Sequence, residues 1–302
     1  MTTRNWTMPR LGCTAAYVFA YRNTQMTLDD YTEAIESVAR MEFDGLDLEI
    51  LDDTHIPIYT PQRCRMLRAH ARRMGVRLSG FTPWNTQKYL YSLDARRRQR
   101  GLALFEQGCR VARDLGIRRV HLGSDVPAEL VATRMTEYTG APPLRMRWDR
   151  LSWSNAWRLT VDTYRQANRV ARKHGLRMGL EPRANSMIWS ADSFLRLREA
   201  VGRNLTCVWD LMHAAYHRED SALAIRKLGS ALGTVQLCDA DGQTLYHRPL
   251  GSGILDFSAI KKALQDIRFQ GPIALELYRS GKDPKAAVDR YYAASKRLWE
   301  SI

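Results

Sequence analysis

Six polar side chains lie between or directly after apolar residues in short aliphatic runs of the sequence: Glu49, His121, Glu181, Asp210, Gln236 and Glu276. Alternate side chains of a strand point to opposite faces, so a polar residue with apolar neighbours faces away from the covering helices. If these runs form parallel strands of one sheet, three carboxylates (Glu181, Asp210 and Glu276) and the Gln236 carboxamide converge at one end of it.

Such a cluster is costly without a counter-charge. Carboxylates at close range repel one another, and each loses hydration on burial. A divalent cation would remove both penalties, and carboxylate and amide oxygens suit hard or borderline ions. We therefore expect one metal ion, with Mn²⁺ favoured and Mg²⁺, Co²⁺ or Zn²⁺ as alternatives. The competing interpretation is a network of ion pairs in which Arg183, Arg248 or Arg279 neutralises the acids.

The elements that must position these residues alternate along the whole chain. Short apolar runs are separated by longer segments of helical period, which is typical of parallel βαβ units. We count eight of each, so we expect one domain over residues 1–302, a closed (β/α)8 TIM barrel with its active site at the carboxyl ends of the strands. The expected strands are Gly12–Phe19, Gly45–Ile50, Arg77–Pro83, Arg118–Gly123, Leu176–Pro182, Leu205–Leu211, Gly233–Asp239 and Pro272–Tyr278.

The expected helices begin near Leu28, Pro61, Asp94, Trp148, Ala191, Asp220, Phe257 and Pro284. In the last of them Asp283 is expected as the N-cap before a proline at the first helical position. Four glycines fall between a helix and the next strand, where a left-handed C-cap is expected: Gly75, Gly116, Gly175 and Gly271.

Composition excludes several classes of protein. The 302 residues are 45% hydrophobic and 26% charged, as in a globular chain with a sizeable core, so disordered and low-complexity classes are excluded. No apolar run approaches the ~20 residues of a membrane helix, and the first ten residues lack the apolar core of a secretory signal, so we expect a cytoplasmic protein. The five cysteines form no C-x-x-C pair and are expected to be buried, reduced thiols.

The formal charge of +14 would suit an acidic ligand or a nucleic acid. Most arginines, however, fall on predicted helix faces beside an apolar stripe, as in residues 96–100. Such runs normally face water. Nucleic acid is therefore not expected as a partner.

Five motifs in the second half of the chain resemble, in order and spacing, those of the xylose isomerase-like TIM-barrel superfamily. The resemblance is to its sugar phosphate isomerases/epimerases, ketose 3-epimerases and inosose dehydratases, and it is most specific from Gly179 to Tyr278. The motifs are Gly179-Leu180-Glu181-Pro182, the run from Trp209 to Ala214, the run from Val235 to Asp239, the run from Gly251 to Phe257, and Ala274-Leu275-Glu276.

The resemblance implies that Glu181, Asp210, Gln236 and Glu276 occupy the positions that bind one metal ion. Gln236 departs from the family, which usually has a histidine there. An amide oxygen donates less strongly than imidazole, so we expect weaker metal binding, with Gln236 either a direct ligand or a contact through water. His213, in the Asp-x-x-His pattern, is implied as a contact to the substrate oxygen. Its alternative role is packing.

The resemblance also implies a chemistry. A metal bound to the carbonyl and adjacent hydroxyl of a keto sugar acidifies the intervening C–H and stabilises the enediolate. In the resembled epimerases the two metal-binding glutamates act on opposite faces of the substrate, which implies Glu181 and Glu276 as catalytic residues. His121 is a further candidate base because an unperturbed histidine titrates near neutrality, although strand histidines are often structural.

Other residues are expected to bind the substrate from the loops. Trp84 follows the third strand and suits stacking on a sugar ring, and His247 and Arg248 suit contact with a phosphate or a hydroxyl. The longest loop is expected at about residues 124–147, after the fourth strand. It leads into three tryptophans, which fit either a ligand platform or a helix face packed on the barrel: Trp148, Trp153 and Trp157.

The main interpretation is an isomerase or epimerase of a free or phosphorylated keto sugar or polyol. The same chemistry would serve a lyase that expels a β-substituent, such as an inosose dehydratase or a C-glycoside deglycosidase of 3-oxo-glucosides. An abasic-site DNA endonuclease of a related barrel family would need histidines where Trp84 and Gln236 stand. A catalytically silent subunit is the last alternative. The working protein is expected to be a homo-oligomer or a complex with another subunit.

Overall fold

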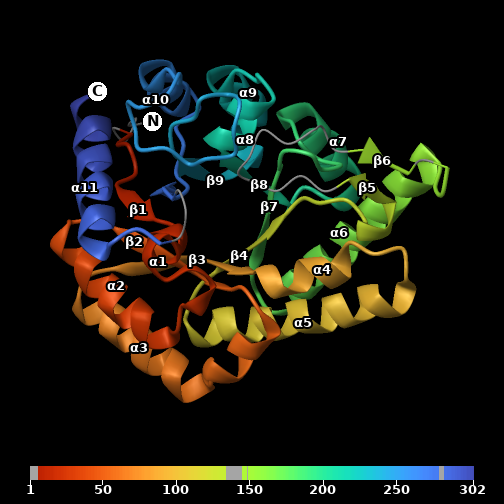
Figure 1. Cartoon of the computed structure of the whole chain (residues 1–302), viewed down its shortest axis with the longest axis horizontal. Coiled ribbons are helices and arrows are strands. Elements are labelled where there is room, and N and C mark those ends of the chain that lie inside the picture. The colour runs from red at the N-terminus through yellow and green to blue at the C-terminus, as the bar shows by residue number, and fades with distance from the viewer. Residues whose placement is uncertain (1–5, 134–144, 148, 279–281) are drawn as a thin grey trace, which may run out of the picture.

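A closed barrel of eight parallel strands forms the centre of the computed structural model, which describes residues 6–133, 145–147, 149–278 and 282–302 (Figure 1). The TIM barrel expected from the sequence is confirmed. In their order around the barrel the strands are β1 (Leu11–Cys13), β10 (Ile273–Leu275), β9 (Leu232–Leu237), β8 (Thr206–Asp210), β7 (Arg177–Glu181), β4 (Arg119–Gly123), β3 (Arg77–Pro83) and β2 (Gly45–Ile50).

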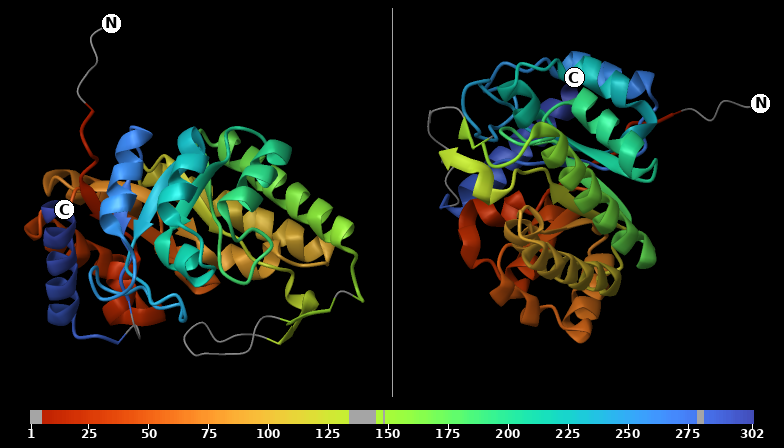
Figure 2. Two further views of the ribbon diagram at one scale, coloured as in Figure 1. Left: turned by 90° about the horizontal axis from the view of Figure 1, so that it is seen from above. Right: turned by 90° about the vertical axis from the view of Figure 1, so that its right-hand side faces the viewer.

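Helices cover the outside of the barrel (Figures 1 and 2). The eight that alternate with the strands are α2 (Leu28–Arg40), α3 (Pro61–Arg73), α5 (Ala95–Asp114), α6 (Trp153–Lys173), α7 (Ala191–Val201), α9 (Ser221–Leu228), α10 (Phe257–Asp266) and α11 (Lys285–Ser301). Side-chain oxygens of Thr27, Thr60, Asp94 and Ser190 accept backbone N–H groups at four of their N-termini. The apolar faces of these helices pack on the strands and form the core between the two layers.

The sequence-based boundaries were wrong at the first strand and at the fourth helix, which was expected to begin near Trp148 and begins at Trp153. The run Gly12–Phe19 was expected to be one strand, but β1 ends at Cys13 and the short helix α1 (Ala16–Arg22) follows. Tyr17, Val18 and Ala20 are buried on that helix. A short apolar run satisfies a strand and a buried helix equally well, so hydrophobic periodicity could not separate them.

Glycines end several helices as expected. Gly75, Gly116 and Gly175 have φ between 71° and 77°, in the left-handed region. Gly271 was expected to do the same and does not. A Cβ atom there would lie 2.3 Å from the carbonyl oxygen of Gly233, so close backbone approach is the reason for glycine at this position. The last helix also differs, because Pro284 and not Asp283 is its N-cap residue.

The loops at the carboxyl ends of the strands carry the remaining elements. After β3 come η3 (Trp84–Thr86) and α4 (Gln87–Leu90), and after β8 comes α8 (Leu211–Tyr216). The loop expected at residues 124–147 holds η4 (Ala128–Leu130) and an antiparallel pair, β5 (Val131–Thr133) with β6 (Arg145–Met146). Residues 134–144 and Trp148 lie outside the described part of the chain.

The arginine-rich helix faces meet solvent as expected: Arg96, Arg97 and Arg100 on α5 are exposed. All five cysteines are buried as free thiols. Among the described residues, no helix combines the length and the apolar character that crossing a membrane requires.

Candidate active site

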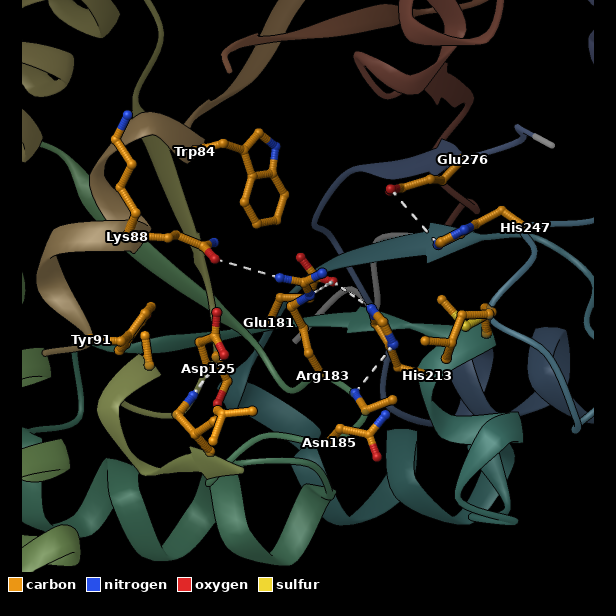
Figure 3. A pocket seen from close by; sticks show the side chains of 18 of the residues that line it. Trp84, Lys88, Tyr91, Asp125, Glu181, Arg183, Asn185, His213, His247 and Glu276 are labelled. Atoms are coloured by element: carbon orange, nitrogen blue, oxygen red, sulfur yellow. Dashed lines mark hydrogen bonds and ion pairs between the residues drawn. The ribbon is translucent and has the colours of Figure 1, made fainter. Parts of the chain in front are cut away.

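A pocket of about 230 Å³ opens where the carboxyl ends of the barrel strands meet. Its lining includes Trp84, Glu181, His213, His247 and Glu276. Figure 3 shows Trp84, Lys88 and Tyr91 along one side and His213, His247 and Glu276 along the other, with Glu181 and Arg183 between them. Five of the residues singled out from the sequence therefore share one cavity.

Two imidazoles and three carboxylates form a continuous chain of contacts at this end of the barrel, and Figure 3 shows two of its links, His213 with Glu181 and His247 with Glu276. His213 Nε2 lies 3.1 Å from Glu181 Oε1 and 3.6 Å from Asp210 Oδ2. His247 Nε2 lies 2.9 Å from Asp210 Oδ2 and 3.9 Å from Glu276 Oε1. Glu181 and Asp210 are the last residues of β7 and β8, and Glu276 directly follows β10, so the three carboxylates meet at the strand ends, as the alternation of side chains predicted.

Asp210 is fixed by the backbone on which it sits. It is the last residue of β8 and the N-cap of α8, where its Oδ1 accepts the N–H of Met212 at 2.8 Å. The thiol of Cys238 donates to the same oxygen at 3.6 Å. The other oxygen, Oδ2, is thereby left for the two histidines and for any ion that binds between them.

Burial and mutual repulsion act strongly on these acids. Burial, followed by the charges of Asp210 and Glu181, raises the pKa of Glu276 well above its usual range. Burial would also raise the pKa of Asp210, but the charges of His247 and His213 outweigh it and hold that pKa below its usual range. The site is therefore short of positive charge.

Two buried acceptor atoms in the cluster have no hydrogen-bond partner among the described residues. They are Oε2 of Glu276 and Oε1 of Gln236. Gln236 lies in register with Asp210 on β8 and with Ala274 on β10. Unpartnered buried oxygens are costly, and a divalent cation accepts oxygen ligands of this kind. The residues present therefore fit a metal ion.

The donor atoms of two residue groups lie close enough to hold an ion, within 4.8 Å of one another in each group. The groups are Glu181, Asp210 and His213, and Asp210, Cys238 and His247. Asp210 belongs to both groups, so its carboxylate would take part in binding an ion at either position.

Trp84 is held from two sides. Its indole N–H donates to Glu49 Oε2 at 2.6 Å, and the guanidinium of Arg183 lies 5.2 Å from its ring centre. Burial raises the pKa of Glu49 to about 7, with the Trp84 hydrogen bond acting in the opposite direction. Trp84 lines the pocket as expected, although one of its faces is covered by Arg183.

Four of the predicted site residues are not part of the pocket lining: Asp210 and Gln236, which belong to the cluster described above, and His121 and Arg248. His121 is packed between the strands, close to Gly80 and Gly179, and burial lowers its pKa to about 3, with a smaller contribution from Arg119. Arg248 donates to Asp241 Oδ2 at 2.6 Å. A catalytic role for His121 and a substrate contact for Arg248 stay predictions.

The proposed neutralisation by arginine applies only in part. Arg183 Nε lies 3.7 Å from Glu181 Oε1, whereas Arg248 pairs with Asp241. Arg279 lies outside the described residues. Ion pairs with the described arginines therefore do not neutralise Asp210 or Glu276.

The later tryptophans lie apart from the pocket. On α6 the rings of Trp153 and Trp157 stack with their centres 6.1 Å apart, and Arg196 lies 4.5 Å above Trp157. Neither ring lines the cavity. Trp157 is half-buried against the core and fits the packed helix face, whereas Trp153 is exposed.

Sequence reasoning missed how deeply His247 enters the cluster. It treated this residue as a substrate contact in a loop, whereas His247 is 2% exposed and touches two of the acids. The only signal was a histidine close before the Gly251-Ser252-Gly253 turn. Nothing in the spacing showed that the loop folds back over the end of β10.

The profile of the family described as xylose isomerase-like TIM barrel matches residues 35–298. Among curated proteins, none matches the sequence significantly.

Solved structures match over nearly the whole chain. A D-psicose 3-epimerase from Clostridium cellulolyticum H10 has a TM-score of 0.75 at 20% identity, covering 97% of this chain and 99% of that one. A 3-keto-D-glucoside 4-epimerase from E. coli has a TM-score of 0.72 at 19% identity, covering 96% and 100%. An L-ribulose 3-epimerase has a TM-score of 0.73 at 19% identity, covering 97% and 95%. At these identities the likeness concerns the fold.

Proposed function

The chain belongs to the xylose isomerase-like TIM-barrel family, and from that premise we propose that it is a metal-dependent enzyme that epimerises or isomerises a keto sugar. The observation that carries the proposal is the meeting of three carboxylates at the carboxyl ends of β7, β8 and β10 beside two buried oxygens without a partner among the described residues, Gln236 Oε1 and Glu276 Oε2. The matched structures support it, since their names are those of sugar epimerases.

Glu181, Asp210, Glu276 and Gln236 would hold the ion. Mn²⁺ is our first choice because three carboxylates and one amide form an oxygen-rich set. When bound, such an ion polarises a substrate carbonyl and lowers the pKa of the neighbouring C–H. Every other step falls to the side chains of the pocket.

Proton transfer is assigned to Glu181 and Glu276. They come from β7 and β10, with β8 and β9 between them, so they approach a bound sugar from different sides. One carboxylate removes the proton from the carbon next to the carbonyl, and the other returns a proton on the opposite face to complete epimerisation. His213 and Arg183 lie 3.1 Å and 3.7 Å from Glu181 Oε1, where they hold that carboxylate in place.

The charges of the pocket wall favour an unphosphorylated sugar. Of the described lining residues only Lys88 and Arg183 are permanent cations. Lys88 Nζ is shared between Asp52 and Asp53 at 3.6 Å from each, and Arg183 lies beside Glu181 and over Trp84. A phosphate would have to compete with these acids. We therefore propose a neutral keto sugar or keto-glycoside as the substrate.

Solvent isotope exchange tests the proposal without a guess about the product. Candidate sugars are incubated with protein and Mn²⁺ in D₂O, and recovered sugar is analysed for deuterium next to the carbonyl. The panel contains free ketoses, sugar phosphates, inososes and 3-oxo-glucosides. We expect incorporation with a free ketose or a 3-oxo-glucoside. Because general acid–base residues contribute about 10²–10⁴-fold, Glu181→Gln and Glu276→Gln should each slow exchange by that factor.

The same experiment separates the alternatives. Release of a leaving group from an inosose or a 3-oxo-glucoside would assign the chain to the lyases. Exchange that persists in the chelated protein and in the double variant would refute the mechanism. Cleavage of abasic DNA in its place would support the endonuclease interpretation.

A further inference from the structure

We infer that His247 supplies, from a loop, the imidazole ligand that the family usually takes from the strand position occupied here by Gln236. The inference rests on the proposed function, because it concerns the same metal ion. It assigns to His247 a role in holding the ion and not the contact to substrate expected from the sequence.

The first support is the path of the chain after β9. Asp239 and Arg248 exchange two backbone hydrogen bonds of 2.8 and 2.9 Å, and His247 accepts one from Tyr278 at 3.2 Å. The segment that ends at Arg248 thus lies antiparallel to the residues that follow β9 and β10. This pairing brings the His247 ring to the mouth of the barrel, between Asp210 and Glu276.

The second support is distance. Two donor atoms bound in adjacent positions to one ion, with bonds of about 2.0–2.2 Å, lie about 3 Å apart. His247 Nε2 and Asp210 Oδ2 are 2.9 Å apart. At that separation the two atoms can bind one cation in adjacent positions.

The third support separates His247 from His213, which also lies about 3 Å from a carboxylate. The backbone N–H of Ala184 donates to His213 Nδ1 at 3.3 Å, so a neutral His213 carries its proton on Nε2, the atom that faces Glu181. A protonated nitrogen cannot bind a metal. His247 Nδ1 accepts no such bond among the described residues, so it can carry the proton and leave Nε2 free.

The His247 ring is held by stacking. Its centre lies 4.5 Å from that of Tyr278 with an interplanar angle of 24°, and the side chain is almost completely buried. Metal-binding histidines are usually oriented by a hydrogen bond from their second nitrogen. Here the aromatic contact and the backbone pairing fix the orientation.

The experiment measures the ligand and not the turnover. Chelated full-length protein is titrated with Mn²⁺ by calorimetry, and the complex is examined by pulsed EPR for coupling of the ion to a directly bound imidazole nitrogen. The variants are His247→Gln and, as a matched control with the same change of side chain in the same cluster, His213→Gln. Thermal unfolding of each chelated variant reports on folding.

We expect the nitrogen coupling in the unaltered protein and in His213→Gln, and its loss in His247→Gln. Losing a ligand should weaken Mn²⁺ binding at least as much as losing a supporting residue, about 10–100-fold. Adding Gln236→His to His247→Gln should restore both coupling and affinity, because the strand then provides the ring. If His247→Gln does not fold, coupling that persists in His213→Gln still supports His247.

Three results would overturn the inference. Nitrogen coupling that survives in His247→Gln but disappears in His213→Gln would make His213 the ligand, and tight Mn²⁺ binding without nitrogen coupling would mean an all-oxygen site. In both cases the proposed function stands and only the assignment of His247 fails. Absence of Mn²⁺ binding to the unaltered protein would overturn the metal dependence itself.

Discussion

Glu49 should make the stability of the chelated protein fall as pH rises. This carboxyl is 9% exposed, and burial raises its pKa from 4.5 to about 7. Between these two pH values the unfolded chain releases the proton while the folded protein keeps it. The unfolded state is therefore favoured progressively, and the loss of stability is complete above about pH 7.

The size of the effect follows from the two pKa values. At about 1.4 kcal/mol per pH unit, the span from 4.5 to about 7 corresponds to about 3 kcal/mol. An unfolding entropy of about 2.1 cal/mol/K per residue gives about 0.6 kcal/mol/K for this chain, so the melting temperature should change by about 5 °C. Glu49→Gln keeps an acceptor for the Trp84 indole N–H and removes the titration.

The assay is thermal unfolding of chelated protein and of Glu49→Gln at intervals from pH 4.5 to pH 8. The difference in melting temperature between Glu49→Gln and the unaltered protein should increase by about 5 °C in favour of the variant from pH 4.5 to pH 8. Trp84→Phe is the complementary control, because losing the hydrogen bond that lowers the Glu49 pKa should enlarge the pH dependence. A difference between the two proteins that stays constant with pH would refute the assignment of a raised pKa to Glu49.

Three further predictions concern single positions. Gln236→His should tighten metal binding, most of all for Zn²⁺, because neutral imidazole is the better ligand for a borderline ion. Calorimetric titration that gives the variant and the unaltered protein equal affinities for every metal would place Gln236 outside the ligand set. His121→Asn should keep kcat/KM within about tenfold of the unaltered protein, since a buried ring with a pKa of about 3 is a weak base. A loss above about 100-fold would make His121 a catalytic candidate again. Gly271→Ala should lower the free energy of unfolding by about 1–3 kcal/mol in chemical denaturation, because the new Cβ would lie 2.3 Å from the Gly233 carbonyl oxygen. An unchanged denaturation midpoint would mean that the backbone relaxes without cost.

The barrel and the inward direction of its acids were predictable because both follow from local patterns. Eight apolar runs alternate with helical segments, and a polar residue between apolar ones must turn away from the helices. Glu181 and Asp210 accordingly end β7 and β8, and Gln236 is the penultimate residue of β9, all at the expected end of the barrel. The bounds of β2 and β3 were correct to the residue.

The misassigned parts depend on information that a local pattern does not carry. Residues 12–19 are apolar enough for a strand or a buried helix, and the choice is made by packing against the rest of the barrel. The place of His247 depends on the pairing of its loop with Tyr278, 31 positions further along the chain. Pairings across irregular loops leave no periodic trace in the sequence.

The direct passage from β8 into α8 has a consequence for redesigning the proposed active site. Asp210 ends the strand and caps the helix, with no connecting residue between the two elements, so its carboxylate moves only if the barrel wall moves. The long connections after β4 and β9 are separate pieces of chain that border the same pocket through Val131 and Leu245. The outer connections, which would select the substrate, are thus separate segments from the strand-to-helix junction that holds Asp210. Under the proposed function, libraries that vary only the outer connections would change the sugar that binds and keep the strand-to-helix junction unaltered.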